Sequence, residues 1–413
     1  MAKIAILGFG TVGSGVYEVL CRNAAGVSRR AGEPVEVKYI LDPKDFSGHP
    51  AANLFVKSID TILQDPEVRV VVETIGGTRF AYPYVKACLE SGRSVCTSNK
   101  EMVATYGAEL LGLAKAHDCA FLFEASVGGG TPIITPMHQC LAANVISQVQ
   151  GIVNGTTNFM LTKMVQESLS FDDALRIAQE LGYAETKDPS DDVDGRDACR
   201  KIAILSSLIS GQQVDFEDIY CEGITEVTVE DMKYAREMGM TIKLLASSKR
   251  QGERLHAIVA PCLLYPEHPL YNVNGVFNSI FVHGNVLGDA MFYGSGAGKL
   301  PTASAVVSDV VEAAKNLHRN VMTMWKQEKL KIEDKADAKR RFFIRMKGDP
   351  EAMLSDLQYS FGEIRIVRVP GLSGEFGFTT PVMMEGDYDT RAKRYEDQIL
   401  HMIRIEDLDG TGE

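Results

Sequence analysis

The 413-residue sequence predicts an α/β protein in three parts: a doubly wound parallel sheet, an α+β unit and a small C-terminal α+β unit. Two observations support this class. Up to about residue 135, short β-branched runs alternate with longer helical stretches, which is typical of β-α-β units. Beyond about residue 140 the strict alternation ends. The 45% hydrophobic and 24% charged residues are ordinary for folded domains and unlike a disordered chain.

The first domain is predicted from its strand-like runs and the helical stretches between them. The runs are residues 3–7, 35–41, 68–76, 94–98 and 119–125, separated by helical stretches that include 16–21, 82–91 and 104–116. A later segment, 303–321, also has helical apolar spacing and could return to pack on this unit. We therefore expect a first domain over 1–135, completed by about 300–321.

Mixed elements predict a second domain over 136–300. A strand is expected at 146–154, helices at 171–181 and 196–210, and further strands at 255–261 and 275–286. Interleaved acids and bases follow at 326–341, which predicts a solvated helix within a linker over 322–341. A third domain is expected over 342–413.

The charge and the ends of the chain exclude some partners. A formal net charge of −12 gives no field that attracts nucleic acid or anionic membranes. No apolar stretch reaches membrane-spanning length, and no leader precedes the first strand, so we expect a cytoplasmic protein. The eight cysteines form no CxxC pair, which predicts buried apolar residues rather than a zinc site or a disulfide framework.

A glycine-rich turn follows the first strand directly and opens a helix. It consists of Gly8, Phe9, Gly10, Thr11, Val12 and Gly13. The first glycine permits the turn, the second lets a pyrophosphate approach the backbone, and the third allows close helix–strand packing. In this strand-turn-helix context the motif predicts a Rossmann-type dinucleotide-binding domain, and a merely structural turn is the alternative.

Asp42, at the end of the second predicted strand, bears on the choice of dinucleotide. A carboxylate at this point accepts hydrogen bonds from the ribose hydroxyls of NAD and repels the 2′-phosphate of NADP. The cofactor is therefore expected to be NAD(P), with a preference for NAD. Alternatively, Asp42 caps the Asp-Pro turn and Lys44 serves a phosphate.

Two polar clusters predict chemistry. Lys100 follows Ser98 and Asn99 at the carboxyl end of a predicted parallel strand, the edge where ligands bind in such sheets. Five carboxylates between residues 185 and 194 precede a helix on which Asp197 and Lys201 stand one turn apart. A lysine held near the interior by an aspartate has a tunable pKa and can donate a proton. The alternative is that these residues cap helices or are exposed.

Seven segments together resemble the homoserine dehydrogenase family in order and spacing. They are GFGTVGSGV, TSNKEMVA, FEASVGGGTPII, VNGTTNF, ELGYAE, DPSDDVDGRDACRKIAIL and GSGAGKLPTASAVVSDV. The resemblance covers most of residues 1–321. It implies NAD(P)-dependent interconversion of L-homoserine and L-aspartate 4-semialdehyde on the route to threonine and methionine. A related semialdehyde dehydrogenase and a non-catalytic nucleotide-sensing regulator are the alternatives.

The resemblance also implies residue roles. Lys201 is the implied proton donor, and Lys100 lies beside the reacting carbon. Asp197 is implied both as a catalytic residue and as an acid that holds the substrate. The substrate-binding residues implied are Glu185, Asp191, Asp192, Asp197, Thr156 and Gly155. Further cofactor contacts are implied for Thr74, Ile75, Gly76, Ser98, Lys100, Gly296 and Gly298. The chain is one residue longer than the family pattern between Glu185 and Asp188.

The loop at 124–131 resembles the monovalent-cation site of the family. The implied ligands of a sodium ion are Glu124, Val127, Gly129 and Thr131. The residues alone favour a glycine turn that needs positive φ.

The segment from Arg341 to Met346 begins like a regulatory ACT module. Gly348-Asp349-Pro350 stands where such modules carry a Pro-Gly loop, which puts amino-acid feedback through this loop in question. A structural or oligomer-forming extension is the alternative for 342–413. The family leads us to expect a homodimer or homotetramer.

Overall fold

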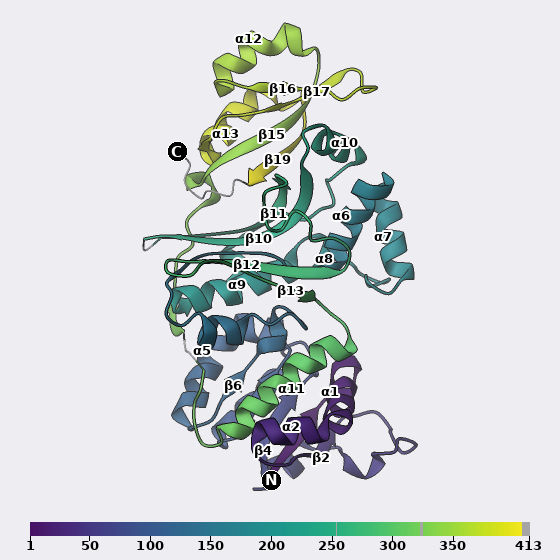
Figure 1. Cartoon of the computed structure of the whole chain (residues 1–413), viewed down its shortest axis with the longest axis vertical. Helices are drawn as coiled ribbons and strands as arrows, with labels where there is room; N and C mark the ends of the chain where they lie inside the picture. The colour runs from purple at the N-terminus through teal and green to yellow at the C-terminus, as the bar shows by residue number, and fades with distance from the viewer. Residues whose placement is uncertain (253, 323–324, 407–413) are drawn as a thin grey trace.

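The computed structural model describes residues 1–252, 254–322 and 325–406. Figure 1 shows an elongated molecule, with the N-terminal sheet at one end, a second sheet across the middle and the C-terminal elements at the other end. Residues 323–324 of the predicted linker and 407–413 of the predicted third domain lie outside the described residues. Among the helices described, none is both long and apolar enough to span a membrane.

The first sheet is parallel throughout and has the predicted doubly wound order, β3-β2-β1-β4-β5-β6. Its strands are β1 (Ala2–Leu7), β2 (Val35–Leu41), β3 (Phe55–Val56), β4 (Val68–Glu73), β5 (Ser94–Thr97) and β6 (Phe121–Leu122). The flanking helices are α1 (Thr11–Arg22), α2 (Ala24–Ala31), α3 (Ile59–Leu63), α4 (Ala81–Glu90) and α5 (Lys100–Ala116). Helices on both faces bury the sheet, which is why its central strands read as continuous apolar runs.

Helix α11 (Lys299–Lys315) returns from the second unit and packs against α1, as predicted (Figure 1). The approach is close. A Cβ at Gly15 of α1 would lie 2.8 Å from the carbonyl oxygen of Lys299. Only glycine therefore fits at this helix contact.

The second sheet has eleven strands and crosses the middle of the molecule (Figure 1). Its part from the predicted second domain is β7 (Ile146–Ile152), β9 (Tyr220–Cys221), β10 (Thr241–Gln251), β11 (Arg254–Leu264), β12 (Phe277–Gly284) and β13 (Gly288–Ser295). Its helices are α6 (Gly155–Glu167), α7 (Phe171–Glu180), α8 (Ser190–Val193), α9 (Arg196–Ser210) and α10 (Val229–Glu237). Helix α9 packs against β7, β10 and β11 and also against α5, so it bridges the two sheets.

The C-terminal strands continue the second sheet. They are β15 (Lys339–Lys347), β16 (Arg365–Val367), β17 (Glu375–Thr379), β18 (Met383–Met384) and β19 (Ile399–Glu406), with α12 (Pro350–Phe361) and α13 (Glu385–Ala392) between them. β19 pairs with β11 in parallel, from Cys262 opposite Arg404 to Leu264 opposite Glu406. The order β19-β15-β17-β16 with two crossing helices is that of a ferredoxin-like β-α-β-β-α-β unit. The more specific ACT resemblance stays a prediction.

The prediction of a helix in the linker is wrong. Lys326–Lys329 form β14, which pairs with β8 (Gln212–Gln213), and β15 already begins at Lys339. Main-chain hydrogen bonds from Leu330 to Gln213 and from Glu333 to Leu255 hold the intervening chain extended on the second unit. Tertiary pairing therefore overrides the helical charge pattern of this segment.

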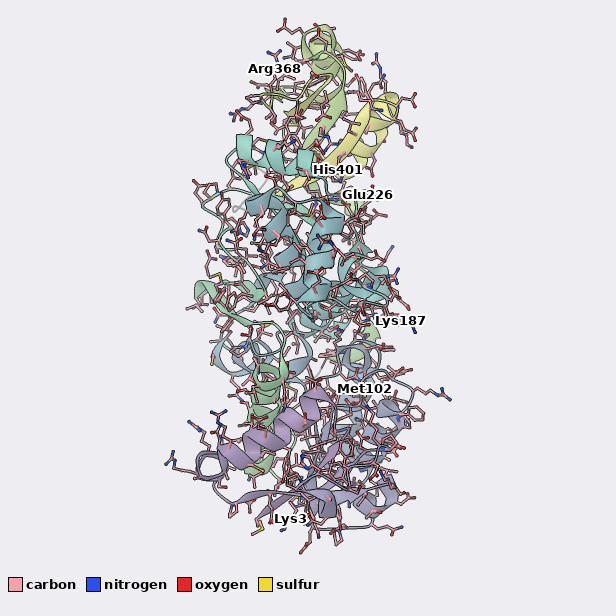
Figure 2. All side chains as sticks on the ribbon, turned by 90° about the vertical axis from the view of Figure 1, so that its right-hand side faces the viewer. Lys3, Met102, Lys187, Glu226, Arg368 and His401 are labelled. Atoms are coloured by element: carbon pink, nitrogen blue, oxygen red, sulfur yellow. The ribbon has the colours of Figure 1, made fainter. Side chains whose placement is uncertain are left out.

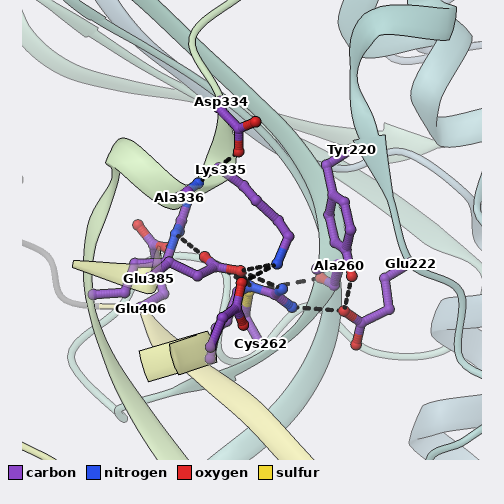
Figure 3. A network of polar contacts seen from close by, with 12 residues as sticks. Tyr220, Glu222, Ala260, Cys262, Asp334, Lys335, Ala336, Glu385 and Glu406 are labelled. Atoms are coloured by element: carbon purple, nitrogen blue, oxygen red, sulfur yellow. Dashed lines mark hydrogen bonds and ion pairs between the residues drawn. The ribbon is translucent and has the colours of Figure 1, made fainter. Parts of the chain in front are cut away.

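Buried charges join the C-terminal unit to the second unit (Figure 3). The Arg404 guanidinium lies 2.6 Å from a Glu385 oxygen and 2.7 Å from a Glu222 oxygen. Lys335 donates to Glu385 at 3.2 Å. Burial alone would raise the pKa of Glu385, but hydrogen bonding and attraction from Arg404 outweigh it, so the pKa is lowered and the carboxyl is ionised.

Candidate active site

The glycine-rich turn has the geometry that a bound dinucleotide needs. Gly8 has φ of +89°, and a Cβ at Gly13 would lie 2.0 Å from the carbonyl oxygen of Gly8, so both positions require glycine. A Cβ at Gly10 would meet open space. Gly10 is also the N-cap residue of α1 and has no side chain to cap the first N–H groups. These groups fit the phosphates of a dinucleotide.

Asp42 supports the main chain around this turn. Its Oδ2 accepts a hydrogen bond from the Phe9 N–H at 2.8 Å, and its Oδ1 accepts one from the Lys44 N–H at 2.9 Å. The capping interpretation of Asp42 therefore holds. It does not preclude the ribose interpretation, because each carboxylate oxygen can accept a second hydrogen bond.

Glu73 is a buried acid at the same edge that the sequence analysis missed. It ends β4, and its Oε1 accepts hydrogen bonds from the N–H groups of Ile75 at 2.7 Å and Gly76 at 3.2 Å. Its Oε2 accepts one from the Thr97 hydroxyl at 2.5 Å. Burial raises its pKa. Glu73 thus ties the predicted cofactor turn, Thr74 to Gly76, to the strand end that precedes half-buried Ser98 and Lys100.

Asp197 and Lys201 meet Lys100 between the two sheets. Gly195, with φ of +81°, is the N-cap residue of α9, and Asp197 is buried in the first turn of this helix. Asp197 is 2% exposed, and its Oδ2 accepts from the Lys201 Nζ at 2.7 Å while its Oδ1 lies 2.5 Å from the Lys100 Nζ. Lys201 also donates to the Val153 carbonyl at 2.7 Å. One carboxylate therefore holds two ammonium groups from two helices.

Asn154 completes the cluster and was not predicted as a site residue. Its side-chain N–H₂ donates to Asp192 at 2.7 Å and to Asp197 at 2.9 Å. Its Oδ1 accepts from the Thr157 N–H and so caps α6. The signal in the sequence was an asparagine before a Gly-Thr-Thr helix start, which indicates a cap but not the second pair of bonds.

The pKa shifts in the cluster have opposite directions. Burial alone would raise the pKa of Asp197, but the charges of Lys201 and Lys100 outweigh it and lower the pKa. Burial lowers the pKa of Lys201, and the attraction of Asp197 only partly offsets this. Burial also lowers the pKa of Lys100, but Asp197 more than compensates, so the pKa is raised. Burial raises the pKa of Asp192. Lys201 is thus the lysine whose proton is held less tightly.

The other predicted substrate residues are spread more widely. The Thr156 hydroxyl donates to the Tyr183 carbonyl at 2.7 Å, and Gly155 lies where a Cβ would be 2.8 Å from the Val276 carbonyl oxygen. Asp191 pairs with Arg200 at 2.6 Å.

Glu185 is exposed, and the structure does not bring its carboxylate to the cluster. In the longer loop that follows it, Lys187 projects from the side of the molecule (Figure 2).

The predicted cation loop uses its carboxylate on the main chain. Glu124 is 3% exposed and accepts hydrogen bonds from the N–H groups of Ile133, Ile134 and Thr135 at 2.6 to 3.0 Å. The Thr131 hydroxyl is buried and has no hydrogen-bond partner among the described residues. Among all the described residues of the chain, no group of three or more His, Cys, Asp or Glu side chains could hold a metal ion. The ligands that this loop offers a cation are therefore the Thr131 hydroxyl and main-chain carbonyl oxygens.

The segment from Gly294 to Gly298, which contains three glycines, packs against this loop. A Cβ at Gly129 would lie 2.1 Å from the Gly296 carbonyl oxygen, and a Cβ at Gly296 would lie 2.1 Å from Cγ of Asn278. Gly298, with φ of +117°, precedes α11. These glycines allow three segments to meet closely beside the nucleotide-binding unit.

Comparison with known proteins identifies the family. The model of the homoserine dehydrogenase NAD-binding domain matches residues 8–124, and the homoserine dehydrogenase model matches residues 132–311. The chain belongs to the homoserine dehydrogenase family. It is therefore an oxidoreductase, and the resemblance read from the sequence is confirmed.

Relatives and solved structures agree with this assignment. Homoserine dehydrogenase from Bacillus subtilis is 42% identical over 77% of this chain and 74% of its own length. The enzyme from Synechocystis is 45% identical over 75% and 72%. The structure of a homoserine dehydrogenase from Thiobacillus denitrificans matches with a TM-score of 0.90 at 35% identity and covers 98% of both chains. A hyperthermophilic archaeal homoserine dehydrogenase in complex with NADPH matches with a TM-score of 0.66 at 31% identity, over 76% of this chain and 99% of its own.

Proposed function

We propose that Lys201 is the proton donor and acceptor in the reaction of this family, the reversible NAD(P)-dependent reduction of L-aspartate 4-semialdehyde to L-homoserine. The observation that carries the proposal is the shared carboxylate of Asp197, which holds the Lys201 and Lys100 ammonium groups at 2.7 Å and 2.5 Å. A purely structural ion pair needs one lysine here, whereas two cations suit an oxygen that becomes negatively charged during reaction.

The lowered pKa of Lys201 suits both directions of the reaction. In reduction its ammonium gives a proton to the aldehyde oxygen as negative charge develops there. In oxidation its neutral amine takes the proton of the homoserine hydroxyl. The bound nicotinamide supplies or accepts the hydride. Asp197 and the Val153 carbonyl orient the Lys201 Nζ in both protonation states.

Lys100 and the acids divide the remaining roles. Lys100 is the second cation beside the developing charge, since it is 35% exposed on the side of the nucleotide-binding sheet. Asp192, held through Asn154 next to Asp197, is placed for the substrate ammonium. Thr156 and Gly155 begin the adjoining helix α6. Glu185 and Asp191 are assigned to substrate binding from the family resemblance, and a movement of the exposed loop would be needed to bring Glu185 in.

For the cofactor we propose NAD(P) with a preference for NAD. The glycine turn and the open α1 N-terminus fit the phosphates, and Asp42 supplies a carboxylate at the end of β2. Asp42→Asn keeps one side-chain oxygen but removes the charge. We expect the ratio of kcat/KM for NAD over NADP to fall about tenfold or more, since a hydrogen bond to a charged group contributes about 1.5–3 kcal/mol. An unchanged ratio in a folded variant would remove Asp42 as the determinant.

For the cation loop and the assembly we propose two further features. Main-chain carbonyl oxygens of Glu124, Val127 and Gly129 with the Thr131 hydroxyl would hold a sodium ion, a set of hard oxygen ligands that the unpartnered Thr131 supports. Association into a homodimer or homotetramer is supported by the edge strand β13, on which Met291 and Tyr293 are 45% and 53% exposed.

The experiment for the proposed function is reduction of NAD and of NADP by the purified chain with L-homoserine, followed at the nicotinamide absorbance. Turnover with L-homoserine and none with L-serine is expected, because the serine hydroxyl is one carbon closer to the ammonium and carboxylate groups. Folded protein that gives no homoserine turnover with either dinucleotide would contradict the proposal.

A further inference from the structure

Two free thiols lie together beneath the first turn of the helix that carries Asp197 and Lys201. Cys199 is on α9 between these two residues, and Cys221 is on β9. Cys199 lies one turn after Gly195 on α9, and the Cys221 Sγ lies against Gly195, so the two thiols are neighbours. The Cys199 Sγ is 3.2 Å from the Phe216 carbonyl oxygen, and the Cys221 Sγ is 3.3 Å from the Asp194 carbonyl oxygen.

The backbone around this pair is tight. A Cβ at Gly195 would lie 3.2 Å from the Cys221 Sγ, and the Gly195 carbonyl accepts the N–H of Cys199. Gly195 is the N-cap residue of α9. Cys221 therefore touches the start of the catalytic helix, and Cys199 is one of its first-turn residues.

The two thiols differ in exposure and in acidity. Cys199 is 3% exposed, whereas Cys221 is half-buried and open to small solutes. The neighbouring Cys199 thiol lowers the pKa of Cys221, whereas the Cys221 thiol and burial together raise that of Cys199. Burial and the charge of Asp194 oppose the Cys221 thiolate, and positive charge on Arg196 and Arg200 favours it.

The remaining cysteines lack this combination. Burial raises the pKa values of the Cys88, Cys119 and Cys262 thiols to about 12, and that of Cys96 is also raised. Cys21 is exposed, but its hydrogen-bonding neighbour is Tyr17 rather than another thiol.

We propose that Cys199 and Cys221 form a reversible oxidation site, in which hydrogen peroxide converts the two thiols to a disulfide and lowers turnover. The Cys221 thiolate attacks one peroxide oxygen, the O–O bond breaks, and the released hydroxide takes up a proton to become water. The Cys199 sulfur then attacks the sulfenic acid on Cys221, and the hydroxyl leaves with the Cys199 proton as a second water. Two thiols lose two electrons in total, and one peroxide becomes two waters.

The effect on turnover follows from the place of the pair and rests on the proposed function of α9. A covalent S–S bond is shorter than any contact between two unbonded thiols, so oxidation draws the first turn of α9 toward β9. Asp197 lies on that turn and holds Lys201, Lys100 and Asn154 within hydrogen-bond distance. Displacements of this kind commonly cost orders of magnitude in rate, and we expect at least about a tenfold loss of kcat.

The test treats the full-length reduced protein with hydrogen peroxide, then measures homoserine turnover and maps disulfide-linked peptides by mass spectrometry. We expect a Cys199–Cys221 peptide, loss of turnover, and recovery of both after dithiothreitol. Cys221→Ser should keep the basal turnover and resist peroxide, and Cys199→Ala should do the same. Cys140→Ser, at an exposed cysteine, is the matched control and should remain sensitive.

The outcomes separate this proposal from the proposed function. Absence of the Cys199–Cys221 peptide, or equal inactivation of Cys221→Ser and wild type, would overturn the oxidation site. The linked peptide with unchanged turnover would overturn the proposed effect on activity, whereas the proposed function fails only if the reduced protein does not oxidise homoserine.

Discussion

The carboxylate of Asp197 determines the protonation of the residues around it. It is nearly inaccessible to solvent, yet it accepts hydrogen bonds or ion pairs from Lys201, Lys100 and Asn154. A buried carboxylate with three such partners stays ionised, because each partner stabilises the charge that burial disfavours. Lys201 is left with a lowered pKa and a fixed position.

The pH dependence of turnover should report this arrangement. The neutral form of Lys201 accepts the proton in homoserine oxidation, so kcat in that direction rises as pH increases through its pKa. In semialdehyde reduction the ammonium form donates, so kcat falls through the same pKa. We call the rise of kcat in oxidation and its fall in reduction the two limbs of the pH profile. Because the pKa of Lys201 is lowered, both limbs should lie at a lower pH than the pKa of an ordinary lysine.

Lys100→Met sharpens this test. Lys100 repels the Lys201 proton, so its removal should move both limbs to higher pH, in addition to lowering kcat. Lys115→Met, at the exposed end of the same helix, is the matched control and should leave the limbs in place. If the two limbs of Lys100→Met lie at the same pH as in the wild type, or at a lower pH, the assignment of Lys201 as the titrating group is contradicted. The measurement is kcat in both directions across the pH range.

Residue types and spacing predicted Lys100, Asp197 and Lys201 as a site, and the structure brings them together. Asn154 and Glu73 escaped prediction for a physical reason. An asparagine at a helix start and an acid at a strand end each have an ordinary local function, and their second hydrogen-bond partners lie far away in the sequence. Glu185 shows the opposite case, because its predicted role depends on a loop path that spacing does not determine.

At the scale of elements, different glycines of the turn between β1 and α1 serve folding and dinucleotide binding. Gly13 is needed by the fold, since a side chain would collide with the Gly8 carbonyl. Gly10 is not crowded by the protein at all. Its small size therefore serves something outside the chain, as the dinucleotide hypothesis requires.

Alanine at these two glycines should therefore act differently. Gly13→Ala should lower the free energy of unfolding by about 1–3 kcal/mol through overpacking. Gly10→Ala should change it by less than about 1 kcal/mol and raise the KM for the dinucleotide roughly tenfold or more. Urea denaturation and steady-state kinetics measure the two effects. Equal destabilisation by both variants, or an unchanged KM in Gly10→Ala, would contradict this division.

The linker shows where element prediction from sequence fails. The alternating charges of 326–341 fit a helix, but this stretch contains β14 and the start of β15. Trp325, which is 1% exposed, donates to Gln213 at 2.8 Å and anchors the strand beside it. That partner lies more than a hundred residues earlier, so local pattern could not reveal it.

For the whole molecule, the continuous second sheet makes the C-terminal unit part of the catalytic unit. β19 pairs with β11, and Arg404 of β19 is held by Glu385 and Glu222 (Figure 3). The sequence predicted a third part of α+β type over 342–413, and helices and strands lie in its described residues. It could not show the pairing of β19 with β11, because edge-to-edge contacts between distant strands leave no periodic signal.

Arg404→Met should test this connection. The substitution leaves Glu385 buried without its main partner, and breaking a buried pair in this way costs about 3–5 kcal/mol. We expect a lower thermal midpoint and faster amide hydrogen exchange in both β19 and β11. Arg394→Met, which removes an exposed pair with Asp356, is the matched control and should cost less than about 1 kcal/mol. Faster exchange confined to the C-terminal elements would contradict the joint unit.

The most direct test of the central claim is homoserine oxidation by Lys201→Met, with dinucleotide binding measured on the same preparation. The account predicts a loss of kcat of about 100- to 10,000-fold, as expected for a proton-transfer group, with an unchanged dinucleotide Kd. Lys233→Met, at a half-buried lysine of α10 that pairs with Glu230, should behave as wild type. Turnover in Lys201→Met within a few-fold of the wild type would contradict the assignment of Lys201 as the proton donor.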